Sequence, residues 1–196
     1  MAIRTDVLRV DFADERCVLV VCEGERPWTL RIDATAGHPA LSPRGVLRQV
    51  GGLLLLLTEG EHRRSGAAYF PQLHRLSRDG LLLWSLRARV VGEPLLVGEH
   101  LLVPVRMARS MHEPEERAEL YVQVRDPDTG MLLAMYPLRP PPVLERAYVH
   151  AVRGVGVRLH AQGDAVEVTV SAWFTGRQSP PRGAGEFAVR IALSGA

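Results

Sequence analysis

The sequence predicts an all-β fold built from repeated antiparallel units, and three observations support this prediction. Apolar and polar residues alternate with a period of two in several segments, as in strands that bury one face. Short turns containing glycine or aspartate separate these segments, as tight hairpins require. A unit of apolar strand, polar loop, alternating strand, glycine turn and second apolar strand recurs along the chain.

The two clearest copies of this unit occupy residues 53–86 and 101–136. Fainter copies flank them at residues 17–37 and 166–196. Four units of one kind predict a single all-β repeat domain over residues 1–196. The glycine turn of each copy is placed at Gly37, Gly80, Gly130 and Gly195.

Two hairpin segments carry a resemblance to a known repeat. LHRLSRDGLLLW (73–84) and VRDPDTGMLLAMY (124–136) resemble the outer hairpins of pyrroloquinoline-quinone-like, WD40-type β-propeller repeats, in which an Asp and a Gly turn precede an apolar strand often ending in Trp. Trp84 fits that last position, whereas the second copy has Met135 and Tyr136 near it. The resemblance covers about half of the chain and implies about four propeller-like blades. A β-sandwich and a half-propeller completed by another chain are the alternatives.

Two segments do not follow the repeat. The last copy stops at its glycine turn, so residues 6–12 are expected to supply its missing outer strand and close a ring. Residues 143–154 fit two interpretations, a short helix after the Pro140–Pro142 run or a strand from Tyr148 to Val152.

Composition excludes several classes of function. All 24 basic residues are arginine, so lysine-based Schiff-base and pyridoxal-phosphate chemistry and the usual P-loop are ruled out. The formal net charge is only +2 and acidic residues are interleaved with the arginines, which argues against a nucleic-acid partner. The first residues lack an apolar signal segment, and the longest leucine run, 53–57, is too short to cross a bilayer. We therefore expect a cytoplasmic protein with no membrane partner.

No residue pattern indicates catalysis. The seven histidines form no metal-binding motif, and Ser65 and Ser110 lack the strand-to-helix turn of a hydrolase nucleophile. Gly154–Gly156 is an isolated GxG motif that predicts a β-bulge or a turn. Cys17 and Cys22 fall on opposite faces of one strand, so we expect two buried free thiols. We assign no catalytic residue, cofactor or metal.

The resembled family includes quinone-dependent dehydrogenases, but these need a much larger eight-bladed ring with acidic calcium ligands and a Trp that stacks on the cofactor. The chain has neither that length nor an identifiable set of ligands. The resemblance therefore implies the repeat fold and not the oxidoreductase activity. Enzymatic function stays open, with the sequence leaning against it.

Two polar loops, residues 59–72 and 106–119, join strands at equivalent places in the clear copies and carry residue types enriched in protein interfaces. We expect a non-enzymatic protein-interaction or scaffold module, an accessory subunit of a bacterial assembly that binds a protein partner. A small-molecule-binding or enzymatic propeller with a central or loop-face pocket is the alternative, and tolerated surface insertions would explain the loops without any function. The candidate partner-binding residues are Arg63, Arg64, Tyr69, Phe70, Arg106, Arg109 and Met111.

Overall fold

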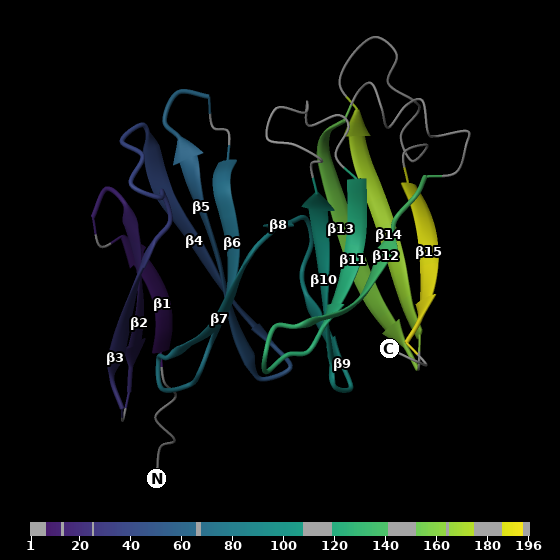
Figure 1. Cartoon of the computed structure of the whole chain (residues 1–196), viewed down its shortest axis with the longest axis horizontal. Helices are drawn as coiled ribbons and strands as arrows, with labels where there is room; N and C mark the ends of the chain where they lie inside the picture. Colours follow the sequence, from purple (N-terminus) through teal and green to yellow (C-terminus); the bar gives the residue numbers. More distant parts are fainter. Residues whose placement is uncertain are drawn as a thin grey trace. The chain divides into compact units, whose positions relative to one another are not determined.

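The described part of the chain consists of β-strands and the turns and loops that join them. The computed structural model describes residues 7–12, 14–24, 26–65, 68–107, 119–140, 152–163, 165–174 and 186–193. Within these ranges it contains 15 strands and no helix, and the strands form four antiparallel sheets of three to five strands (Figure 1). The predicted all-β class with blade-sized antiparallel units is therefore confirmed.

The chain divides into two compact units. The first unit comprises Met1–Ala88 and Asp128–Gly130, and the second comprises Arg89–Pro127 and Met131–Ala196. Each unit contains two of the four sheets and its own cluster of buried apolar side chains.

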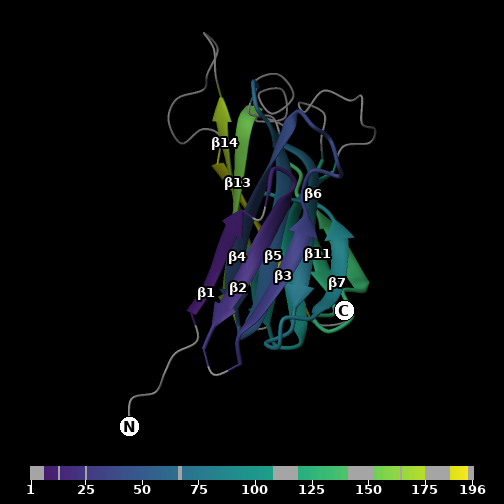
Figure 2. The same cartoon turned by 90° about the vertical axis from the view of Figure 1, so that its left-hand side faces the viewer.

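The first unit begins with a three-stranded sheet, sheet A. Its strands are β1 (Val7–Phe12), β2 (Cys17–Glu23) and β3 (Trp28–Asp33), in the order β1-β2-β3 (Figure 2). The central strand β2 is apolar on both faces and is buried almost along its whole length. Its two cysteines, Cys17 and Cys22, are free and buried, which confirms the prediction.

Sheet B, the second sheet of the first unit, has four strands in sequence order. They are β4 (Leu41–Val50), β5 (Leu53–His62), β6 (Ala68–Leu76) and β7 (Leu82–Arg87). Gly51 and Gly52 join β4 to β5 with φ values of +53° and +86°, as a two-residue hairpin turn requires. The buried residues that pack sheet A against sheet B are Val18, Val20, Ile32, Ala34, Leu54, Leu56 and Leu76.

Two glycine turns of the first unit lie against tryptophan side chains. A Cβ atom at Gly80 would lie 2.4 Å from Trp28 Cδ2, and one at Gly130 would lie 2.8 Å from Trp84 Cδ2. Trp28 Nε1 also donates a hydrogen bond to the carbonyl oxygen of Arg78 at 2.8 Å. Both glycines have positive φ, 81° and 73°, so conformation and close approach both favour glycine at these positions.

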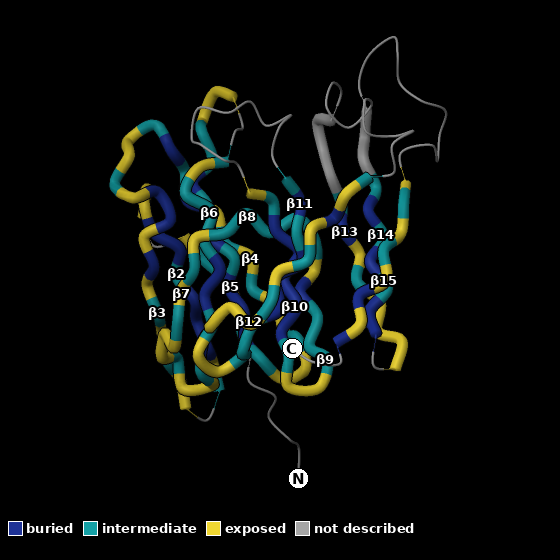
Figure 3. The backbone as a smooth tube through the Cα atoms, turned by 45° about the vertical axis from the view of Figure 1, so that its right-hand side comes forward, coloured by how far each residue is buried: buried dark blue, intermediate teal, exposed yellow. Residues whose placement is uncertain are grey.

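The second unit contains sheets C and D. Sheet C is formed by β8 (Arg89–Val90), β9 (Leu95–Val97), β10 (His100–Met107), β11 (Glu119–Arg125) and β12 (Leu132–Pro137). Sheet D is formed by β13 (Val152–Gln162), β14 (Ala165–Phe174) and β15 (Glu186–Ala192). Residues of β10, β11 and β14 supply most of the shared core, and burial is concentrated on such central strands (Figure 3).

Two expectations about the ends of the repeat are wrong. Residues 7–12 do not complete the last sheet, because β1 pairs with β2 along its whole length and Leu8 and Val10 pack against the core of the first unit. Gly37 does not lead to an outer strand of sheet A, because the next strand, β4, pairs with β5. Trp28 on β3 and Trp84 on β7 make equivalent contacts with glycine turns, so β3 corresponds to β7. The sequence repeat had aligned β3 with β6, so the predicted alignment of sheet A with sheet B was wrong by one strand.

The segment around residue 150 is described only in part. Residues 141–151 lie outside the described residues, and β13 begins at Val152. The pairing of β13 with β14 shifts register between Val152 and Gly154, which agrees with the bulge, one of the two alternatives predicted for the GxG motif. Among the described residues there is no helix long and apolar enough to cross a membrane.

Candidate interaction site

Three connections meet at one end of the first unit, which we call the loop end. It comprises residues 14–16 between β1 and β2, residues 34–40 between β3 and β4, and residues 62–65 and 68–70 around the β5–β6 hairpin. Backbone hydrogen bonds link these connections, because Ala34 N donates to Arg16 O at 3.0 Å and Arg63 N donates to Ala40 O at 3.2 Å. The loop end is therefore a connected surface rather than three separate loops.

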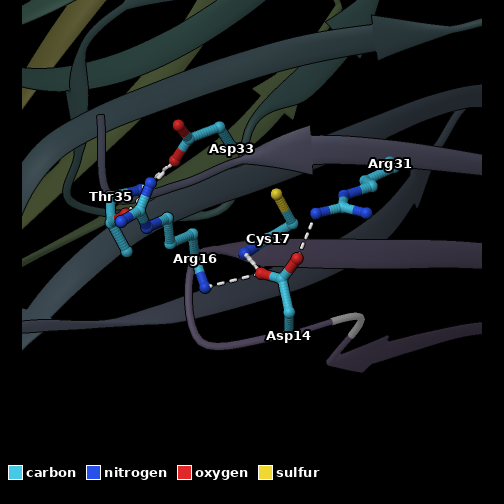
Figure 4. A network of polar contacts seen from close by, with 6 residues as sticks. All are labelled: Asp14, Arg16, Cys17, Arg31, Asp33 and Thr35. Atoms are coloured by element: carbon cyan, nitrogen blue, oxygen red, sulfur yellow. Dashed lines mark hydrogen bonds and ion pairs between the residues drawn. The ribbon is translucent and has the colours of Figure 1, made fainter. Parts of the chain in front are cut away.

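Asp14 organises the first of these connections (Figure 4). Its Oδ1 atom accepts hydrogen bonds from the backbone N–H groups of Arg16 at 2.7 Å and Cys17 at 2.9 Å, and its Oδ2 atom pairs with Arg31. The pKa of Asp14 is lowered, first by the N–H of Arg16 and then by the N–H of Cys17 and the charge of Arg31. These contacts hold the tight turn that starts β2.

Asp33 plays a similar part at the start of the second connection. Its Oδ1 atom accepts hydrogen bonds from the backbone N–H of Thr35 at 2.8 Å and from the Thr35 hydroxyl at 3.2 Å (Figure 4). Thr35 is completely buried, and Ala36 next to it has a φ of +50°. A short acidic side chain that bonds the backbone two residues ahead is a common way to fix such a turn.

Arg63 ties the hairpin to its neighbours. Its Nε atom donates to Ser42 Oγ at 3.2 Å, and its Nη2 atom lies 3.3 Å from Glu15 Oε2. The Glu15 side chain is 84% exposed, so this ion pair is a surface contact of small energetic weight. The following residue, Arg64, is exposed and forms no ion pair with another described residue.

A β-bulge shapes the start of β6. The pairing of β5 with β6 shifts register between Thr58 and Gly60, and within the extra stretch Phe70 adopts a φ of +51°. A bulky non-glycine residue rarely adopts this conformation, and such strained bulges are frequent beside functional surfaces. The bulge leaves Tyr69 47% exposed and places the Phe70 ring 5.8 Å from the guanidinium carbon of Arg87.

The structure brings together four of the predicted partner-binding residues. Arg63, Arg64, Tyr69 and Phe70 all lie at the loop end. The predicted loop over residues 59–72 is shorter than expected, because β5 extends to His62 and β6 starts at Ala68. The charged residues and the bulge had hidden the strand alternation there.

Of the other three predicted residues, only one lies in the part of the chain that the structure describes. Arg106 belongs to β10 of the second unit, where it is paired with Leu120 of β11 and Arg89 of β8. Arg109 and Met111 lie outside the described residues. Glu15 and Arg87 were not predicted from the sequence, because the packing of sheet A on sheet B brings Glu15 to Arg63 and the register of β6 and β7 brings Arg87 to Phe70.

A second polar group, which the sequence did not reveal, crosses sheet B. His74 on β6 is 2% exposed and lies between two hydroxyl groups, with Nε2 at 2.9 Å from Thr58 Oγ1 and Nδ1 at 2.7 Å from Ser85 Oγ. A neutral imidazole has one donor and one acceptor nitrogen, and each hydroxyl can take either role, so the group is satisfied internally. Burial lowers the pKa of His74 to about 4.

The His74 group has part of the geometry of a nucleophile and its base, but its chemistry is weak. A base with a pKa of about 4 is a poor proton acceptor near neutrality, and Ser85 lies in the middle of an extended strand rather than on a sharp turn. The group is therefore best explained as a buried polar link between β5, β6 and β7.

The described residues contain no group of three or more His, Cys, Asp or Glu side chains that could hold a metal ion.

No family model matches the sequence, and the search of curated proteins found no match either.

Proposed function

We propose that the protein is a non-enzymatic, β-propeller-like interaction module that binds a protein partner through the loop end of its first unit. The observation that carries the proposal is the strained bulge at Phe70, next to an exposed Tyr69 and on the same hairpin as Arg63 and Arg64. Tyrosine and arginine are the side chains most often found at the energetic centres of protein interfaces. A rigid sheet that displays them on short, hydrogen-bonded connections loses little entropy on binding.

The propeller-like arrangement is supported by the repeated contact between tryptophan and glycine turn. Trp28 lies against the Gly80 turn and Trp84 against the Gly130 turn, as a repeated unit would place them. The four antiparallel sheets have the size of propeller blades. We further propose that the module serves as an accessory subunit of a larger assembly in the bacterial cytoplasm.

We expect the protein to stop binding its partner when Arg64 and Tyr69 are replaced together by Ala. Both side chains are exposed, so the variant should fold normally and lose only the contact. Arg78→Ala is the matched control, because Arg78 is also an exposed arginine but lies at the opposite end of β6. The measurement is cross-linking followed by mass spectrometry with tagged protein expressed in its own host.

Proteins that cross-link to the wild type and to Arg78→Ala, but not to the double variant, would support the proposal. An identical set of partners for all three proteins would contradict the assignment of the loop end. Loss with both variants would show that the effect is not specific to the loop end, and would also contradict the assignment.

A further inference from the structure

Strand β1 leaves one edge of sheet A open in the described part of the chain. Its six residues pair with β2 on one side, from Val7 with Glu23 to Phe12 with Val18. On the other side no described strand pairs with it, and it forms the margin of the sheet (Figure 2). An open edge offers unpaired backbone N–H and C=O groups to another strand.

The core-facing side of β1 carries an apolar row that is only partly covered. Leu8 and Val10 pack at the margin of the first unit's core and are partly buried. Phe12 follows at the same spacing, and it is 69% exposed, the largest exposed fraction among the large apolar residues of the described chain. A strand added beside β1 would extend the sheet and cover this row.

The opposite side of β1 carries two charges of opposite sign. Arg9 and Asp11 are two residues apart and therefore on the same face, where Arg9 Nε lies 2.7 Å from Asp11 Oδ2. Arg9 also pairs with Glu23 on β2. The two charges are both close to half exposed, so they remain accessible to a strand that lies alongside.

This order of residues is complementary to itself. When two copies of β1 run antiparallel and are centred on Val10, Arg9 of each copy faces Asp11 of the other. In the same register Leu8 faces Phe12, and Val10 faces Val10. Opposite charges and apolar pairs directly across two strands stabilise an antiparallel pair.

We propose that the chain forms a two-fold symmetric dimer in which β1 pairs antiparallel with β1 of a second copy, joining the two sheets A into one continuous sheet. The charge complementarity selects a second copy as the occupant of this edge, because the same six residues supply both halves of every contact. In a two-fold symmetric contact the same edge of β1 is buried on both copies, so no free β1 edge is left to bind a third copy and assembly stops at two. The paired residues of β1 are not among those of the loop end, so the dimer is tested separately from the partner proposed there.

The test is the molar mass measured by light scattering over a concentration series from micromolar to millimolar. The wild type should pass from monomer to dimer as its concentration rises. Arg9→Asp and Asp11→Arg each turn two attractive cross-strand pairs into two repulsive ones, so each should raise the dissociation constant by about tenfold. Arg190→Asp makes the same charge change on an exposed strand residue of the second unit and should leave dimerisation unchanged.

A mixture of the two single variants gives the sharpest result. In the mixed dimer the Arg9→Asp chain carries acidic side chains at both charged positions of β1, and the Asp11→Arg chain carries arginines at both, so opposite charges meet in each cross-strand pair. The mixture, and the double variant Arg9→Asp/Asp11→Arg, should therefore dimerise within a few-fold of the wild type. Phe12→Ser should weaken the dimer without unfolding the monomer, because the Phe12 side chain is exposed.

A wild type that stays monomeric over the whole series would overturn the proposal. Mixed variants that remain as weak as the separate ones would overturn the register. A folded Phe12→Ser variant that dimerises as tightly as the wild type would also overturn the proposal. Circular dichroism melts of each variant show whether a weaker dimer results from the changed contact or from unfolding of sheet A. Neither result bears on binding at the loop end, which the Arg64 and Tyr69 variant tests.

Discussion

The buried imidazole of His74 makes the stability of the protein depend on pH, and the dependence can be calculated. Burial lowers the pKa of His74 from 6.5 to about 4, and the side chain is only 2% exposed. The unfolded chain therefore binds a proton more readily than the folded one between these values. The contribution of neutral, buried His74 to the free energy of unfolding is fully present above pH 6.5. It decreases as the pH falls from 6.5 towards 4 and changes no further below pH 4. The shift of about 2.5 pH units corresponds to an upper limit of about 3 kcal/mol, at roughly 1.4 kcal/mol per unit.

Replacing His74 with Gln tests this calculation, because glutamine can bond both hydroxyl groups but does not titrate. The free energy of unfolding in urea is measured for both proteins at about pH 7 and about pH 5, where the wild type should lose up to about 2 kcal/mol more than the variant. His160→Gln, at an exposed histidine, is the control and should follow the wild type. An equal loss of stability in the wild type and His74→Gln would contradict this prediction, since it would mean that His74 titrates alike in the folded and unfolded chains.

Three other substitutions test features of the first unit by thermal or urea unfolding. Gly80→Ala should lose about 1–3 kcal/mol more stability than Gly52→Ala. Both positions have a positive φ, but only the alanine at position 80 would push its Cβ into Trp28. Equal losses would mean that the indole moves aside freely. Asp14→Asn should lower the melting temperature at neutral pH, and this difference from the wild type should disappear in acid as the wild-type carboxylate becomes protonated. A difference that persists at low pH would mean that the shape of the Asp14 side chain matters and its charge does not. Leu56→Ala, at a completely buried position, should cost about 2–5 kcal/mol, and a cost below about 1 kcal/mol would indicate a loosely packed core.

The strands with regular alternation could be predicted from the sequence because each buries one face against a core. Val166, Val168 and Val170 of β14 are fully buried, as their period of two indicates. Strand β4 was missed because Pro43 and Gly45 interrupt its pattern. Glycine is favoured at position 45 of this strand because a Cβ there would lie only 3.0 Å from the side chains of Val10 and Val18. Such a close approach has no trace in the local sequence.

The site was predictable in its residue types but not in its connections. Arginines beside aromatic residues marked Arg63, Arg64, Tyr69 and Phe70, and these meet at the loop end. The ion pair from Arg63 to Glu15 joins residues 48 apart in the sequence, so it depends on how sheet A packs on sheet B. His74 was passed over for a related reason, because its hydroxyl partners lie on two other strands and become its neighbours only once the register is known.

The connectivity of the sheets has a consequence for how the chain reaches its folded state. Apart from the contact of β8 with β10, every named strand pair of the described chain joins strands that follow each other in sequence. Most of these hairpins therefore close short loops, and most of the backbone pairing costs little chain entropy to form. Sheets A and B can be completed from residues 7–87 alone, while the rest of the chain is still on the ribosome. We therefore expect sheets A and B to be able to form during synthesis, before the strands of sheets C and D are available.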